Sequence, residues 1–246
     1  LTGEQRAITS DVSGTTRDSL DLEITRDGQK YRIIDTAGLR KKARISDKVE
    51  RFSTIRALKS LADCDVAVMM INAEEGPSDQ DAKIIGLAHD YGKGIVIAVN
   101  KWDLVEKNHK TIKEFTDSIH HAFKFAQYAP IVYVSALSGK RCPKVIEAIK
   151  HVAEQRQKRI STNRLNRVLK RQLIKYPPSH YRGRPLKLYY GTQVSSGPPR
   201  FILFFNQPKG LHFSYLRQLK NVLRKEFGFE GTDVKIATRK RDKRSL

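Results

Sequence analysis

The sequence predicts an α/β fold in which a doubly wound sheet is followed by a small α+β domain with the element order α-β-β-α-β. Over the first 160 residues, short apolar runs alternate with stretches of helical periodicity, which is typical of a doubly wound sheet. After residue 160 the element order changes, and the net charge rises from +5 over residues 1–160 to +16 over residues 161–246. The chain of 246 residues is therefore expected to form more than one domain.

The first domain is expected to contain five strands and four helices. The strands are predicted at residues 20–24, 30–34, 66–71, 95–99 and 131–134, and the helices at residues 49–62, 78–91, 111–125 and 143–157. The runs at 66–71 and 95–99 are apolar throughout. A strand of this composition needs cover on both faces, which favours a parallel sheet with helices on each side.

The second domain is expected to begin with a helix at residues 163–176, which ends at Pro177 and Pro178. The elements predicted after it are strands at 185–194 and 200–206, a helix at 214–227 and a strand at 232–237. The resulting domain boundaries are 1–160, 161–238 and a basic tail at 239–246.

The composition excludes several classes of protein. Hydrophobic residues make up 39% of the chain, which suits a packed core and not a disordered chain. No apolar run reaches the roughly 18–20 residues of a membrane helix, and the first residues lack the pattern of a signal peptide. Cys64 and Cys142 do not form a CxxC pair, so neither a disulfide scaffold nor a cysteine zinc site is expected. The expected location is the cytoplasm, without membrane contact.

The charge of the second domain indicates a polyanionic partner. Lys and Arg number 47 in the chain against 26 Asp and Glu, a formal net charge of +21, and most of the excess lies after residue 160. Such a surface is typical of nucleic-acid binding. The alternative is a solvated basic face that serves solubility.

The most specific motif is Asn100-Lys101-Trp102-Asp103, directly after the strand predicted at 95–99. A carboxylate such as that of Asp103 accepts two hydrogen bonds from guanine, at N1–H and the 2-amino group. Adenine offers an acceptor at N1 and no 2-amino group, so it would leave the carboxylate unpaired, at a cost of a few kcal/mol. Asn100 is expected to tie the loop together, and the Lys101 stem to lie over the base. The alternative is a surface loop without a ligand.

A second motif, Asp35-Thr36-Ala37-Gly38, follows the strand predicted at 30–34. Asp35 is placed to hold a magnesium-bound water, and the Gly38 N–H to meet a γ-phosphate. The alternative is a plain turn after a strand.

Two weaker motifs complete the set. In Gly14-Thr15-Thr16-Arg17-Asp18, a threonine hydroxyl can complete magnesium coordination when a γ-phosphate is present, although a helix cap or turn is the simpler interpretation. A further loop, Ser135-Ala136-Leu137, follows the strand predicted at 131–134, and its backbone would meet the guanine O6.

In this order the four motifs resemble the switch I, DxxG, NKxD and SAx signatures of translation-factor-related GTPases. The chain most closely resembles the EngA (Der) family of bacterial tandem GTPases, through GTTRD, DTAGLRKKARI and NKWDL, and then YPPSHYRGRPLKLYYGTQV and FILFFNQP. The resemblance covers essentially the whole chain and implies a second GTPase domain plus a C-terminal KH-like domain. It further implies GTP or GDP and Mg²⁺ as ligands, Thr16 and Asp35 at the magnesium, and a role in assembly of the large ribosomal subunit on its rRNA.

The sequence departs from the family pattern in one respect, because no segment matches the phosphate-binding loop GxxxxGK[ST]. In the family that loop precedes the residues that resemble the start of this sequence, together with the first strand of the sheet. We therefore expect the sequence to be part of a longer polypeptide with an upstream portion, including a first GTPase domain. The competing interpretation is a genuine loss of nucleotide binding.

The residue after the DxxG motif is Leu39, where Ras-like GTPases have a glutamine that orients the attacking water. Leucine cannot bind that water, so intrinsic hydrolysis is expected to be slow, and the resemblance implies help such as a potassium ion near the phosphates. Four basic residues that follow would sense the nucleotide, contact RNA or form a solvated loop: Arg40, Lys41, Lys42 and Arg44.

No GxxG lies between the two predicted helices of the C-terminal domain, where KH modules carry the loop that clamps single-stranded RNA; the GxxG at residues 228–231 follows the second helix. Its strand aromatics are interpreted as core residues in preference to stacking platforms: Tyr189, Tyr190, Phe201, Phe204 and Phe205. The expected RNA contacts are therefore mainly to phosphates, which position a protein without reading sequence. The domain can also pack against the GTPase domain and respond to switch II, the expected segment that contains Arg40, Lys41, Lys42 and Arg44.

The resulting prediction is a GTP-hydrolysing switch that binds ribosomal RNA and particles. One rival is a nonenzymatic RNA-binding assembly factor with a vestigial nucleotide site. A second is a partner in tRNA modification, because GTTRD also resembles the GTPase domain of such proteins. Those proteins lack the basic α-β-β-α-β domain predicted here.

Overall fold

The structure is a computed structural model that describes residues 21–26, 28–34, 60–106 and 108–241. The chain divides into two compact units, residues 1–65 and residues 66–246, each of which is described by itself. None of the described helices is long and apolar enough to cross a membrane.

The first unit contains an antiparallel hairpin. Strand β1 (Asp21–Arg26) pairs with strand β2 (Gln29–Ile34), with Asp21 opposite Ile34 and Arg26 opposite Gln29. Residues 60–63, the last described part of this unit before β3, are helical. The two strands predicted at 20–24 and 30–34 are confirmed, whereas most of the helix predicted at 49–62 lies outside the described residues.

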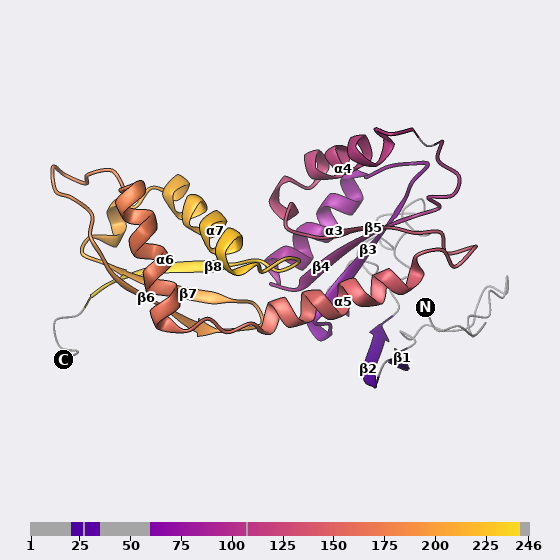
Figure 1. The fold of residues 1–246 in the computed structure, drawn as a ribbon, viewed down its shortest axis with the longest axis horizontal. Coiled ribbons are helices and arrows are strands. Elements are labelled where there is room, and N and C mark those ends of the chain that lie inside the picture. The colour runs from indigo at the N-terminus through magenta and orange to yellow at the C-terminus, as the bar shows by residue number, and fades with distance from the viewer. Residues whose placement is uncertain (1–20, 27, 35–59, 107, 242–246) are drawn as a thin grey trace, which may run out of the picture. The chain divides into compact units, whose positions relative to one another are not determined.

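The second unit begins with a three-stranded parallel sheet of order β3-β4-β5 (Figure 1). Its strands are β3 (Val66–Asn72), β4 (Gly94–Asn100) and β5 (Ile131–Tyr133). The connecting helices are α3 (Asp79–Asp90), α4 (Thr111–Ala122), the short η1 (Lys124–Ala126) and α5 (Cys142–Gln157). The alternation of strands and helices predicted from the sequence is confirmed over residues 66–157.

The central strand β4 is the most deeply buried element of this sheet. All of its residues except the last, Asn100, are buried, because α3 and α5 both pack against it. Helix α3 begins at a capping box in which the Ser78 Oγ accepts from the Asp81 N–H and the Asp81 carboxylate accepts from the Ser78 N–H. The apolar strand β4 therefore lies between helices that cover both of its faces.

The remainder of the second unit has the predicted order α-β-β-α-β. Its elements are α6 (Thr162–Lys175), β6 (Leu188–Ser195), β7 (Arg200–Phe205), η2 (Pro208–Gly210), α7 (Phe213–Phe227) and β8 (Lys235–Lys240). The sheet has the order β6-β7-β8, with β6 antiparallel and β8 parallel to β7. Helices α6 and α7 pack on each other and share one apolar core with β7.

Two predicted strands differ in their limits by three residues. The strand predicted at 185–194 begins only at Leu188, because Lys187 donates its N–H to the Asn206 side chain. The strand predicted at 232–237 is β8, which begins only at Lys235 and runs to Lys240. Arg239 and Lys240, predicted to begin the basic tail, instead pair with Phe204 and Phe205 of β7.

The loop between α7 and β8 joins the two halves of the second unit. The Ile95 N–H at the start of β4 donates to the Gly231 carbonyl (N···O 2.7 Å), and the Gly231 N–H donates to the Tyr128 carbonyl (2.7 Å). Gly231 has a φ of +72°, and a Cβ there would overlap the Val152 side chain on α5. Only glycine fits this approach, so the loop lies directly on the amino end of the parallel sheet.

Replacing Gly191 by alanine is expected to destabilise the C-terminal domain. A Cβ at Gly191 of β6 would lie 2.6 Å from Leu203 Cδ2 and 2.7 Å from Leu169 Cδ1, both fully buried. Overpacking of this kind costs about 1–3 kcal/mol. Thermal or urea denaturation of Gly191→Ala should show that loss in the free energy of unfolding.

Gly86→Ala is the matched control. Gly86 lies inside α3, and the nearest atom to an added Cβ is Phe125 Cζ at 3.8 Å, an ordinary contact. Because alanine has a higher helix propensity than glycine, the free energy of unfolding should stay the same or rise by up to about 1 kcal/mol. Equal destabilisation by both substitutions would contradict this packing of β6 against α6.

Candidate functional site

The carboxyl ends of the three parallel strands bring two predicted loops to one edge of the sheet. In the register, Asn72 of β3 lies beside Asn100 of β4, and Val99 beside Tyr133 of β5. The loop after Asn100 and the loop after Val134 therefore start from neighbouring strand ends. This is the edge at which open α/β sheets bind ligands.

Asn100 connects these two loops. Its side-chain Oδ1 accepts a hydrogen bond from the Ala136 N–H (2.9 Å), and its carbonyl accepts one from the Ala73 N–H (2.9 Å). The Trp102 N–H donates to the Val134 carbonyl (3.0 Å), a second bond between the same loops. The expectation that Asn100 ties the loop together agrees with these contacts.

Lys101 has an unusual backbone conformation. Its φ is +60°, the left-handed region, which costs a residue with a Cβ about 1–3 kcal/mol and recurs at functional sites. Its Nζ forms an ion pair with Glu74 Oε2 at 2.8 Å, and this hydrogen bond raises the pKa of the lysine. Glu74 was not among the predicted site residues, because only the fold brings it beside Lys101.

Trp102 supports the loop from below. Its side chain is buried, with its ring centroid 4.3 Å from that of Tyr133 and 5.4 Å from that of Phe115 in edge-to-face geometry. Trp102 is predicted from the sequence as a nucleotide-binding residue, but its side chain belongs to the core. Its backbone N–H helps to hold the loop. Asp103 follows it in the exposed part of the loop, where a carboxylate can meet a base.

The second loop, Ser135-Ala136-Leu137, has a buried start and an exposed end. The Ser135 hydroxyl is buried and accepts from the Ser138 N–H (3.3 Å), and the Ser135 N–H donates to the Lys140 carbonyl (3.1 Å). Leu137 is 95% exposed. The loop is internally fixed by hydrogen bonds while its tip faces solvent.

Comparison with protein families assigns both parts of the chain. Residues 2–155 match the model of the elongation factor Tu GTP-binding domain, and residues 159–239 match the C-terminal KH-domain-like family of EngA bacterial GTPase enzymes. The chain belongs to the EngA (Der) family. The predicted fold class, a GTPase-type α/β domain followed by a KH-like domain, is thereby confirmed.

Curated relatives in this family carry the name GTPase Der. Those from Caldanaerobacter subterraneus and Thermoanaerobacter pseudethanolicus are 49% and 47% identical over 241 residues, which is 98% of this chain and 55% of each relative. The chain thus spans about half the length of these relatives. Among solved structures, an Aquifex aeolicus Era variant bound to GDP and AlF4⁻ is similar with a TM-score of 0.47, 17% identity and coverage of 95% of this chain and 85% of that one.

Several predicted site residues of this EngA-family chain lie outside the described residues. They are Thr16, Asp35, Thr36, Ala37, Gly38 and Leu39. The magnesium ligands predicted at Thr16 and Asp35 and the γ-phosphate contact of Gly38 therefore stay predictions. Within the described ranges, no group of three or more His, Cys, Asp or Glu side chains is placed to hold a metal ion.

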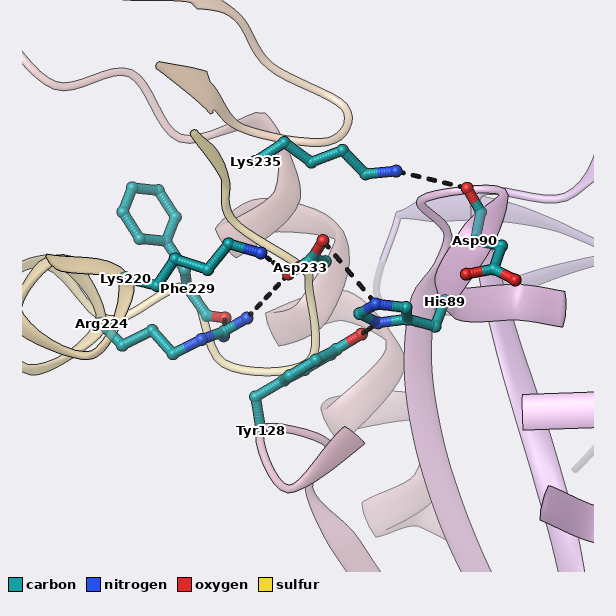
Figure 2. Close-up of polar contacts among 8 residues, drawn as sticks. All are labelled: His89, Asp90, Tyr128, Lys220, Arg224, Phe229, Asp233 and Lys235. Atoms are coloured by element: carbon teal, nitrogen blue, oxygen red, sulfur yellow. Dashed lines mark hydrogen bonds and ion pairs between the residues drawn. The ribbon is translucent and has the colours of Figure 1, made fainter. Parts of the chain in front are cut away.

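A cluster of charged side chains lies where the KH-like domain meets α3 (Figure 2). The buried Asp233 carboxylate forms ion pairs with Lys220 Nζ at 3.5 Å and Arg224 Nη2 at 3.6 Å, and His89 Nε2 lies 4.0 Å away. The Arg224 guanidinium stacks 4.1 Å from the centroid of the Tyr128 ring. This confirms that the KH-like domain packs against the GTPase domain; switch II lies outside the described residues.

Burial controls the protonation of this cluster. Desolvation lowers the pKa of His89 below 6.5, although Asp233 and Asp90 oppose the shift. Burial also raises the pKa of Tyr128, whose hydroxyl lies 2.7 Å from His89 Nδ1. At neutral pH both groups are therefore neutral, and Asp233 offsets one of the two positive charges of Lys220 and Arg224.

The free energy of unfolding should decrease as the pH falls below about 6.5, because of His89. Its folded pKa lies below the 6.5 of the unfolded chain, so as the pH falls the unfolded state takes up the proton first. The stabilisation is present above about pH 6.5 and is lost below it. In denaturation series from about pH 7.5 to about pH 5, His89→Gln should reduce the slope of stability against pH.

His109→Gln serves as the control, because His109 is exposed and outside this cluster. Its pH profile should match that of the unsubstituted protein. The account would be wrong if His89→Gln left the slope unchanged or made it steeper.

Proposed function

We propose that this chain is the guanine-reading and RNA-facing part of a cytoplasmic GTPase switch that acts in assembly of the large ribosomal subunit. The observation that carries the proposal is the hydrogen bond between Asn100 Oδ1 and the Ala136 N–H, which fixes the NKWD loop at the ligand-binding edge of the sheet. Membership in the EngA family supports the same function.

Guanine selection is assigned to Asp103. In the plane of the base, its two carboxylate oxygens would accept N1–H and the 2-amino group, an arrangement that adenine cannot satisfy. The Lys101 stem would cover one face of the base, with Glu74 holding its ammonium group. The Ala136 N–H already donates to Asn100, so a contact with guanine O6 needs shared donation or the neighbouring N–H of Leu137.

GTP hydrolysis forms the second part of the proposal. We assign Thr16 and Asp35 to a Mg²⁺ ion, which would neutralise phosphate charge, and the Gly38 N–H to the γ-phosphate. The sequence contains no GxxxxGK[ST] segment, so the phosphates would be held by residues outside it, upstream in the same polypeptide and accompanied there by a first GTPase domain. With Leu39 after the motif, hydrolysis would be slow without help, for which K⁺ is the proposed source.

The KH-like domain is assigned to ribosomal RNA. We retain the division of the chain at residue 160, but the KH-like domain then includes β8 to Lys240, two residues beyond the expected limit of 238, and the basic tail follows it. The net charge of +16 over residues 161–246 favours contacts with RNA phosphates. Changes in the nucleotide site would alter how this domain is presented to the ribosomal particle.

Asp103→Asn is expected to change the base preference from guanine toward xanthine. The amide oxygen still accepts N1–H, but the amide NH₂ faces the 2-amino group of guanine, whereas xanthine offers an oxygen there. The loss for GDP should be about tenfold to a hundredfold, the cost of an unsatisfied buried donor. Titration calorimetry of the natural polypeptide with GDP and with xanthosine diphosphate measures both affinities.

Asp117→Asn, on the exposed face of α4, is the matched control and should leave both affinities unchanged. Identical GDP binding by Asp103→Asn and the unsubstituted protein would remove Asp103 from the base site.

The ribosomal role is tested by sedimentation of the natural polypeptide with purified large subunits. With a non-hydrolysable GTP analogue, the protein should co-sediment with the large subunit more strongly than with GDP. Particles should also stimulate GTP hydrolysis. Binding that is the same with GTP analogue, GDP and no nucleotide would instead support a nonenzymatic assembly factor with a vestigial site.

A further inference from the structure

The sheet of the KH-like domain has one core face and one open face. Along β7 the side chains alternate: Phe201, Leu203 and Phe205 are buried in the core with α6 and α7. Arg200, Ile202 and Phe204 therefore point to the opposite face. The sequence-based interpretation of all the strand aromatics as core residues is wrong for those on this second face.

Three cross-strand neighbours on the open face form a row. Tyr190 of the edge strand β6 lies opposite Phe204 of β7, and Phe204 lies beside Arg239 of β8. Side chains that are paired in this way stand on the same face of a sheet. The row therefore places two aromatic rings and a guanidinium group next to one another.

The two rings are already stacked. The centroids of Tyr190 and Phe204 are 4.4 Å apart, with an interplanar angle of 18°. Tyr190 remains 39% exposed, although it is a large aromatic residue. One face of its ring is fixed by Phe204, which leaves the other face to stack on a planar ligand without further ordering of the side chain.

The charge of the sheet is entirely positive. Strands β6, β7 and β8 contain no Asp or Glu, and their basic residues are Arg200, Lys235, Arg239 and Lys240. The next row on the open face is smaller: Thr192, Ile202 and Ala237 leave room beside the aromatic pair. Next to the bulged Tyr189, 47% exposed, the Arg241 guanidinium lies 5.3 Å from the ring centroid.

We propose that the open face of β6-β7-β8 binds single-stranded RNA, with a base stacked on Tyr190 and a phosphate held by Arg239. Exposed aromatic rings next to basic groups, on a surface without carboxylates, match the chemistry of single-stranded nucleic acids. Duplex RNA keeps its bases stacked internally and cannot use the ring. This surface is distinct from the GxxG clamp that KH modules carry between two helices; the GxxG of this domain, at residues 228–231, lies between α7 and β8, with Gly231 against Val152 of α5. The proposal rests on the ribosomal RNA partner proposed above and adds where the RNA binds.

The test is fluorescence anisotropy of the natural polypeptide with a labelled oligouridylate of about 12 nucleotides and with a duplex of the same length. Tyr190→Ala should weaken binding of the single strand about tenfold, whereas Tyr190→Phe should keep it within about twofold. Arg239→Gln should weaken binding and reduce the slope of log affinity against log salt by about 0.7. Ultraviolet cross-linking should attach uridine to the peptide that contains Tyr190.

Two matched controls separate this face from general electrostatics. Tyr91→Ala removes a similarly exposed ring outside the KH-like domain, and Arg167→Gln removes an exposed charge from α6. Tyr91→Ala should leave the affinity unchanged, and Arg167→Gln should leave the salt slope unchanged. Duplex binding should not distinguish Tyr190→Ala from the unsubstituted protein.

The proposal is overturned if Tyr190→Ala and Tyr91→Ala bind the single strand equally, or if cross-links map to α6 or α7. It is also overturned if the unsubstituted protein does not bind the single strand at about 0.15 M salt, as expected if another protein segment covers this face. GDP binding is measured on the same samples. Retained GDP binding with no effect of Tyr190→Ala would reject the RNA surface and leave the proposed nucleotide switch standing.

Discussion

The buried strand β4 is the constraint on which the rest of the second unit depends. It pairs in parallel register with β3 on one side and β5 on the other, and it has no solvent-exposed face. A slip of one residue would turn its side chains to the opposite faces and move Asn100 away from the Ala136 N–H. The positions of both candidate base-binding loops therefore follow from the packing of a single strand.

The same strand anchors the KH-like domain at its other end. The Ile95 N–H, one residue into β4, donates to the Gly231 carbonyl, while Asn100 ends the strand at the loop side. The charged cluster around Asp233 adds contacts with α3 next to this point. A buried ion pair of this kind contributes orientation more reliably than net stability, because the desolvation of its charges offsets much of their attraction.

Sequence reasoning predicted most elements of the second unit because their patterns are strong. The continuous apolar run of β4 and the apolar stripe of α7 leave little choice of structure. It failed where neighbours in space decide the outcome. Tyr190 and Phe201 are both aromatic residues in neighbouring strands. Only the pairing register shows that Tyr190 lies on the open face and Phe201 in the core.

The candidate site shows the same division. The NKWD motif is recognisable because it directly follows an apolar run, and in the structure it does begin where β4 ends, at Asn100. Glu74, which holds Lys101, lies 27 residues away and has no motif of its own. The Asp233 cluster likewise joins α3 to a loop more than 140 residues later, which no local pattern could indicate.

The central claim is that the NKWD loop reads guanine. The most direct measurement is a calorimetric titration of GDP into the natural polypeptide, with ADP and ATP as controls. Saturable binding of GDP, with binding of the adenine nucleotides at least a hundredfold weaker, is the predicted result. Equal binding of guanine and adenine nucleotides, or no binding by a folded sample, would contradict the account and leave the basic KH-like domain as the functional part.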